Sequence, residues 1–71
     1  MELSDKVKEL VAVGASITAN CQPCLQHHAE KALGFGADSE EVKAAIEVGK
    51  RVRRGASAKM DCFSSEIEVK S

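Results

Sequence analysis

The sequence predicts a small all-α protein of three to four helices, folded as one domain over residues 1–71. Two observations predict this class. Apolar residues recur at three- and four-residue steps, as on a helix face, and no useful stretch alternates apolar and polar residues as a strand does. Hydrophobic residues make up 44% of the chain but aromatic residues only 3%. The apolar content is therefore mostly Ala, Val, Leu and Ile, which favours closely packed helices.

The first helix is expected from about Ser4 to about Ala19. Ser4 suits the N-cap because its hydroxyl can accept a free N–H of the first turn, and Asp5 suits the positive helix end. Gly14 lets a neighbouring backbone approach closely. The apolar stripe of this helix is Leu3, Val7, Leu10, Val11, Gly14 and Ile17.

Asn20 ends the first pattern, and a second helix is expected over about residues 22–33. Pro23 suits its first turn, because the N–H that proline lacks has no helical partner there. Gly34 and Gly36 are expected to supply left-handed positions that end this helix.

A capping box from Asp38 to Glu41 is expected to open a third helix. Gly55 is expected to end or kink it, and a shorter fourth helix is expected from Ala56 to about Val69. Three apolar side chains of this fourth helix are expected to face inward: Met60, Phe63 and Ile67. The apolar stripe of the third helix contains Val42, Ala45, Ile46 and Gly49.

The length of 71 residues limits how much core the domain can bury. Chains of this size usually gain stability from disulfides, a metal or a partner chain. The many Ala, Val and Ile residues are expected to leave an apolar face exposed, so we expect a homo-oligomer.

Charge and hydropathy exclude two classes of partner. The formal net charge is -1, so no global basic field attracts nucleic acid. No apolar run approaches the roughly 20 residues that cross a bilayer, so no membrane contact is expected. The N-terminus lacks the pattern of a signal peptide, and we therefore expect a cytoplasmic location, where thiols are mostly reduced.

Cys21 and Cys24 form a Cys-x-x-Cys pair at the expected start of the second helix. In a reducing compartment such a pair indicates redox chemistry or metal binding rather than a structural staple. The helix N-terminus lowers the pKa of a thiol there, and this reasoning makes Cys21 the more exposed and more acidic of the two. His28 lies four residues after Cys24, so the two share a helix face and His28 can exchange a proton near neutral pH.

Two other interpretations of this cluster stay open. The thiolates and imidazoles could bind zinc, although zinc modules normally add ligands from a distant segment, and here only Cys62 could add a sulfur. The side chains could also be ordinary packed residues, as Cys62 itself is expected to be. The alternative function is therefore a non-enzymatic helical oligomer whose cysteines and histidine bind metal or sense oxidation. The enzymatic interpretation requires neither a metal nor a cofactor.

Four basic residues lie near the expected end of the third helix, where they would be solvated and would complement the negative helix end. No aromatic side chain accompanies them, so nucleic-acid stacking is unsupported. The cluster is Lys50, Arg51, Arg53 and Arg54.

The segment from Asn20 to Gly34, with the glycine turn and acidic helix start that follow over residues 36–42, resembles the carboxymuconolactone decarboxylase superfamily. The resemblance is closer to its alkyl hydroperoxidase D-like branch, which carries a Cys-x-x-Cys-x-x-x-His motif. That branch also has a glutamate with eleven residues between it and the first cysteine, a position that Glu9 occupies here. The resemblance is strongest over residues 9–55.

The resemblance implies an all-helical, oligomeric domain that reduces peroxides with its cysteine pair. Carried over, Cys24 is attacked by the peroxide, Cys21 resolves the sulfenic acid as a disulfide, and Glu9 and His28 relay protons. A thioredoxin-like or small dithiol reductant restores the pair. Pro23 stands where active relatives often have a histidine. Decarboxylase activity belongs to members that lack this cysteine pair, so it is not expected here.

Overall fold

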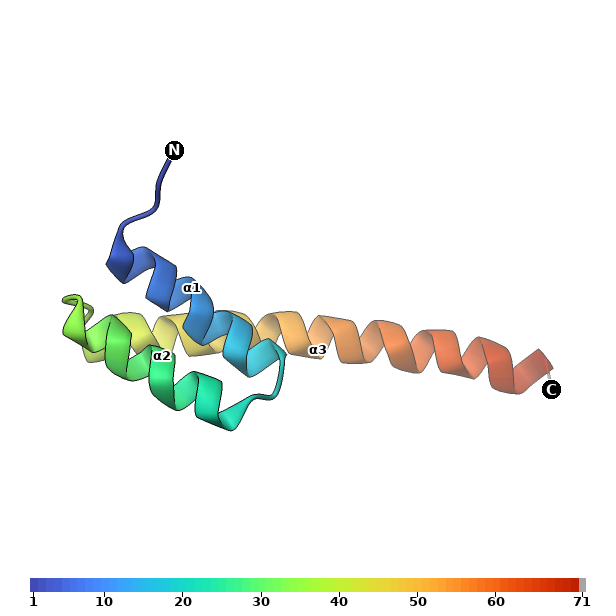
Figure 1. Ribbon diagram of the computed structural model, residues 1–71. Coiled ribbons are helices and arrows are strands. Elements are labelled where there is room, and N and C mark those ends of the chain that lie inside the picture. Colours follow the sequence, from blue (N-terminus) through green and yellow to red (C-terminus); the bar gives the residue numbers. More distant parts are fainter. Residues whose placement is uncertain (71) are drawn as a thin grey trace.

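A computed structural model describes residues 1–70 of the chain, with side chains up to residue 68. Three helices follow one another: α1 (Asp5–Thr18), α2 (Gln22–Gly34) and α3 (Ser39–Lys70). Helix α1 packs against both of the others, while α2 and α3 touch much less. The C-terminal half of α3 projects away from this three-helix cluster (Figure 1). The prediction of a small all-α domain is confirmed.

The helix starts follow from the capping residues. The Ser4 hydroxyl accepts the N–H of Val7 at 3.2 Å, as expected of the N-cap of α1. At the start of α3 the Asp38 carboxylate accepts the N–H of Glu41 at 2.8 Å, and the Glu41 carboxylate accepts the N–H of Asp38 at 3.1 Å. The capping box is therefore confirmed.

Two residues in the turns have a left-handed backbone. Asn20, between α1 and α2, has φ 55°, and Gly36, between α2 and α3, has φ 99°. Gly34 was expected to share that role, but it belongs to the last turn of α2 and has no positive φ. A single left-handed residue is enough to reverse the chain here.

Helices α1 and α3 meet at two glycines. A Cβ added at Gly49 would collide with the carbonyl oxygen of Gly14 and would lie 2.8 Å from Cβ of Ile17. The hydroxyl of Thr18 donates to the Gly49 carbonyl at 3.1 Å, a polar contact across the same crossing. The close backbone approach expected at Gly14 is thus present, and it fixes how α1 crosses α3.

Helix α3 runs through Gly55 without a break, so the expected fourth helix is wrong. One glycine costs a helix about 1 kcal/mol, which the helix-forming residues around it offset. The side chains expected to face inward are exposed instead: Met60 by 64%, Phe63 by 58% and Ile67 by 54%. In the described part of the chain nothing folds back against this half of α3. No helix there is long and apolar enough to cross a bilayer.

The buried residues are few, and they lie mainly between α1 and α2. Val13 and Ala32 are fully buried, and Ser16 and Ala37 nearly so. Val13 and Ser16 lie outside the predicted stripe of α1, which was expected to form the core. Helix α1 uses two faces, one toward α2 and one toward α3, and the second leaves part of the stripe uncovered: Val7 and Val11 are exposed.

Candidate redox site

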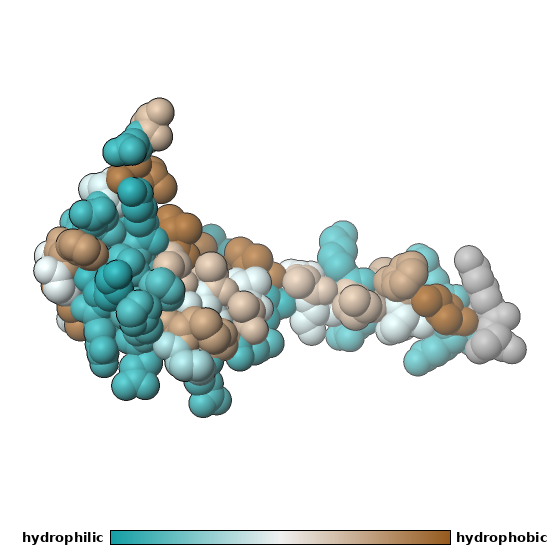
Figure 2. All heavy atoms as spheres, viewed as in Figure 1, coloured by the Kyte–Doolittle hydropathy of each residue, from teal (hydrophilic) through white to brown (hydrophobic). Residues whose placement is uncertain are grey.

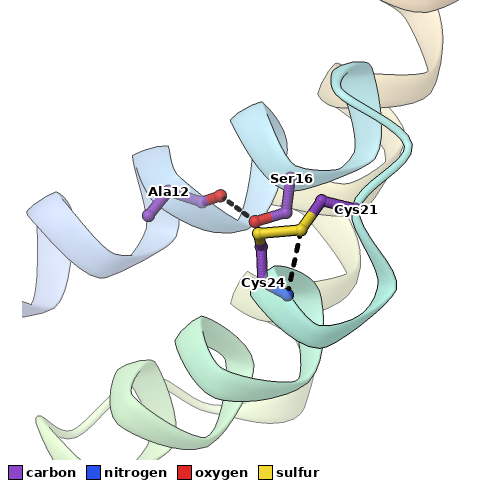
Figure 3. The surroundings of a disulfide bond; sticks show 4 residues. All are labelled: Ala12, Ser16, Cys21 and Cys24. Carbon is purple, nitrogen blue, oxygen red and sulfur yellow. Dashed lines mark hydrogen bonds between the residues drawn. A yellow bond between two sulfur atoms is a disulfide. The ribbon is translucent and has the colours of Figure 1, made fainter.

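Cys21 and Cys24 are joined by a disulfide at the first turn of α2, with their Cα atoms 5.3 Å apart. Cys21 is the N-cap of this helix, and its Sγ accepts the N–H of Cys24 at 3.3 Å (Figure 3). Pro23 lies between them, in the helical first turn that its ring favours. Helical geometry therefore holds the two sulfurs close enough for the pair to open and close with little backbone movement.

The two cysteines differ in exposure. Cys24 is exposed and Cys21 is half-buried, which reverses the expectation that Cys21 is the more exposed. The N–H of Cys21 donates to the carbonyl of Ser16 at 3.0 Å, and this bond holds Cys21 against the end of α1. A molecule approaching from solvent therefore meets Cys24 more readily than Cys21.

Glu9 on α1 and His28 on α2 form a hydrogen-bonded pair. Their atoms Oε2 and Nδ1 are 2.6 Å apart. The other carboxylate oxygen, Oε1, lies 3.8 Å from Nζ of Lys31. The Glu9 side chain is only 14% exposed, and the His28 side chain 31%. The carboxylate is thus held between α1 and α2 by two cationic or proton-donating groups.

The contact determines which of the two groups carries the hydrogen between them. The hydrogen bond with His28 is the main cause that lowers the pKa of Glu9 below its usual range; the positive charges of His28, Lys31 and His27 add to it, and burial opposes it. Glu9 is therefore an acceptor at neutral pH, so Nδ1 of His28 carries the hydrogen between them. The Nε2 edge of the ring remains as the one that can exchange a proton.

The pair lies one helical turn beyond Cys24, because His28 follows it by four residues on α2. Among the described residues, no hydrogen bond joins the imidazole or the Glu9 carboxylate to either sulfur. The ring of His27 meets that of His28 edge to face, with centroids 4.9 Å apart. The structure thus brings Glu9 to His28 and Cys21 to Cys24, and it sets the two pairs on adjacent turns.

Ser16 is a residue of this site that the sequence did not single out. Its side chain is buried, and its hydroxyl donates to the Ala12 carbonyl at 2.7 Å. Figure 3 shows it among the surroundings of the disulfide. The available signal was its spacing of seven residues from Glu9, which puts both on the α1 face that meets α2.

Arg53 also belongs to this region, although it was expected only to be solvated near the end of its own helix. Because α3 continues to Lys70, Arg53 lies in the middle of it. Its Nη1 donates to the Ile17 carbonyl at 3.3 Å and to Oδ1 of Asn20 at 2.9 Å. Arg53 thus caps α1 rather than α3, and it braces the turn that carries Cys21. A cavity of about 180 Å³ is lined by Ser16, Ile17, Asn20, Cys21, Gln22, Leu25 and Arg53.

Cys62 was expected to be a packed thiol, but it is free and exposed on the projecting half of α3. The packing interpretation fails because, within the described residues, no other element covers that half. Among the described residues, no three His, Cys, Asp or Glu side chains are grouped so that they could hold a metal ion.

The sequence profile of the Carboxymuconolactone decarboxylase family matches residues 2–63. The chain belongs to this family, as its resemblance predicted. No curated protein and no solved structure matches the chain.

Proposed function

We propose that this protein is a thiol-dependent peroxidase or disulfide reductase of the alkyl hydroperoxidase D-like type. The observation that carries the proposal is the position of the Cys21–Cys24 disulfide at the N-terminus of α2, one turn before the hydrogen-bonded Glu9–His28 pair. Membership of the family and the Cys-x-x-Cys disulfide are compatible with this activity.

In the oxidative half of the cycle, the Cys24 thiolate attacks one oxygen of the peroxide. The O–O bond breaks, Cys24 becomes a sulfenic acid, and the other oxygen leaves as an alcohol or water once it gains a proton. The Cys21 thiolate then attacks the sulfenic sulfur, which forms the disulfide and releases water. The exposure of Cys24 supports its place as the first sulfur attacked.

In the reductive half, a thioredoxin-like protein or a small dithiol supplies two electrons. One of its thiolates attacks a sulfur of the pair to form a mixed disulfide, and its second thiol releases it as a disulfide. The protein returns to the dithiol form. Cys24 is the more exposed residue of the pair and is the proposed point of attack, and the N–H that the Cys21 sulfur accepts favours Cys21 as the leaving thiolate.

Glu9 and His28 have the role of a proton relay in this proposal. The lowered pKa of Glu9 keeps it ionised, so it accepts the hydrogen of Nδ1 and orients the ring. The opposite ring nitrogen can then take the Cys24 proton and return it to the leaving oxygen, directly or through water. This arrangement follows the general pattern in which an acid orients a histidine that activates a thiol.

Peroxide consumption tests the proposal. Hydrogen peroxide and cumene hydroperoxide are each supplied with dithiothreitol, or with thioredoxin and its reductase, and the wild type is compared with Cys24→Ser. Cys62→Ser is the matched control, because it removes an exposed thiol far along α3. We expect turnover in the wild type and the control but not in Cys24→Ser. If neither peroxide consumption nor reduction of insulin disulfides occurs with any donor, the proposal is wrong.

Metal analysis distinguishes the alternative of a metal-binding module. Protein purified without chelator is assayed for zinc, with Cys21→Ser as the comparison. Stoichiometric zinc that disappears in Cys21→Ser contradicts the redox proposal.

A further inference from the structure

From Val52 onward, α3 carries an apolar stripe that no other described part of the chain covers. Val52, Met60, Phe63 and Ile67 follow one another at steps of eight, three and four residues, which keeps them on one side of the helix. All are more than half exposed. Figure 2 shows apolar surface along the isolated rod as well as on the cluster of helices. A helix that stands alone in water gains nothing from such a stripe.

The same chain also contains an apolar groove without an occupant. It lies between α1 and the first half of α3 and has a volume of about 460 Å³. Valine side chains from both helices form its walls, and the crossing of Gly14 and Gly49 forms part of its floor. The groove is lined by Val7, Leu10, Val11, Gly14, Ala15, Thr18, Ala45, Val48, Gly49 and Val52.

The chain exposes more surface than a compact monomer of its size. Its accessible surface is 5286 Å², whereas a compact protein of this mass exposes about 4300 Å². Its radius of gyration is 15.6 Å, against about 11 Å for a compact domain of this length. The surplus of roughly 1000 Å² is similar to the surface that each partner buries in a standard interface, about 800 Å².

The two halves of α3 carry charges of opposite sign. Residues 50–54 carry four basic side chains and no acidic one, whereas residues 59–68 carry three carboxylates and one lysine. Among the described residues, the exposed side chains of Arg51 and Arg54 have no hydrogen-bond or ion-pair partner. A second α3 that runs in the opposite direction would lie with its acidic half along the basic half of the first.

We propose that two copies of this chain pair through α3, antiparallel, so that the projecting half of each helix covers the groove of the other. A crossing near Ala58 satisfies the geometry, because Ile67 lies nine residues after it and Gly49 nine residues before it. Ile67 of one copy then lies level with Gly49 of the other, about 14 Å from the crossing.

The centre of the pair suits a close crossing. Ala56 is small and lies at the contact, so it allows the two axes to approach. Ala56 lies on the same side of α3 as the stripe, two positions before the crossing, and Met60 lies two positions after it. The antiparallel arrangement therefore sets a small side chain of each copy against a large one of the other. The contact is isologous and closes on itself, so it yields a dimer rather than a fibre.

Sedimentation equilibrium of the full chain tests the pairing with Met60→Glu and Phe63→Glu. Both residues are exposed in the single chain, so these changes leave its helices intact, which circular dichroism verifies. Ser65→Glu is the matched control, because it adds the same charge on the opposite side of the same segment. We expect the wild type and the control to be dimers, or multiples of dimers, at about 20 micromolar, and both stripe variants to be monomers. A monomeric wild type, or stripe variants that remain dimeric, overturns the proposal.

Discussion

The carboxylate of Glu9, on α1, lies 2.6 Å from Nδ1 of His28, on α2, and this contact joins the two helices beside the disulfide. The contact has a structural consequence, because it ties α1 to α2. It also has a chemical consequence, because it fixes which ring nitrogen of His28 holds a hydrogen. The pH dependence of stability and the order of the thiol steps both depend on groups in or next to this contact.

The lowered pKa of Glu9 predicts an acid-sensitive contribution to stability. In the folded state its carboxylate is favoured by His28 and then by Lys31. The contribution is therefore fully present above the ordinary glutamate pKa of about 4.3 and is lost as the pH falls through the lowered folded-state value. Urea unfolding between about pH 6 and pH 3, at one protein concentration, measures it. Glu9→Gln is expected to lose less stability than the wild type over this range; parallel curves for the two proteins contradict the prediction.

Gly49→Ala is expected to destabilise the protein. The new Cβ would collide with the Gly14 carbonyl, which cannot move without shifting α1. A cost of about 1–3 kcal/mol in the free energy of unfolding is typical of such overpacking, and it exceeds the gain from replacing glycine in a helix. Gly55→Ala is the control, since a Cβ there meets nothing within 4 Å. It is expected to raise stability by about 0.5–1 kcal/mol, because α3 is helical at that point. Chemical denaturation compares the two, and a stabilising Gly49→Ala would falsify the described helix crossing.

Arg53→Ala is expected to loosen the turn between α1 and α2. It removes the donor to Ile17 and Asn20, and the partly exposed position limits the loss to about 1 kcal/mol. Hydrogen exchange provides the specific measurement: the amide of Cys21, which donates to Ser16, should exchange faster. Arg54→Ala is the matched control on the next residue and should change neither quantity. Unchanged protection of the Cys21 amide in Arg53→Ala would show that Arg53 does not brace this turn.

A monothiol should attack the disulfide at Cys24 rather than at Cys21. Cys24 is the more exposed, and Cys21 leaves as a thiolate that accepts the N–H of Cys24. The oxidised protein is treated briefly with glutathione and quenched with N-ethylmaleimide, and peptide mass spectrometry locates both groups. We expect glutathione on Cys24 and maleimide on Cys21. The opposite assignment contradicts the proposed order of the two cysteines.

The sequence predicted the local features of this fold better than its long-range contacts. The helix starts could be predicted from Ser4, Asp38 and Glu41, because capping depends on residues only three positions apart. The continuity of α3 through Gly55 was not predictable in this way, because the effect of one glycine depends on whether the chain has another element to turn back against. The apolar stripe of α1 misidentified the core for a related reason. Helix α1 packs against both α2 and α3 and so buries two faces, whereas the periodic pattern of apolar residues indicates only one face.

The proximity of Cys21 and Cys24 could be predicted from their spacing, but the surroundings of the pair could not. Glu9 and His28 are nineteen residues apart, and only the family resemblance brought them together before the structure did. Arg53 gave no usable signal, because a side chain that caps another helix looks like any exposed basic residue until the crossing of the two helices is known. Contacts between elements are set by packing, which the order of residues does not display.

The sulfur of Cys21 has two roles, since it is both a partner in the disulfide and the N-cap acceptor of α2. The redox state of the pair and the fraying of the first turn of α2 are therefore thermodynamically linked. In the dithiol form, a thiolate at this position would accept the same N–H with a full negative charge and would strengthen the cap. Any change that loosens this turn should then shift the equilibrium between dithiol and disulfide. Conversely, a change in the supply of reducing thiols should alter the stability of the first turn of α2.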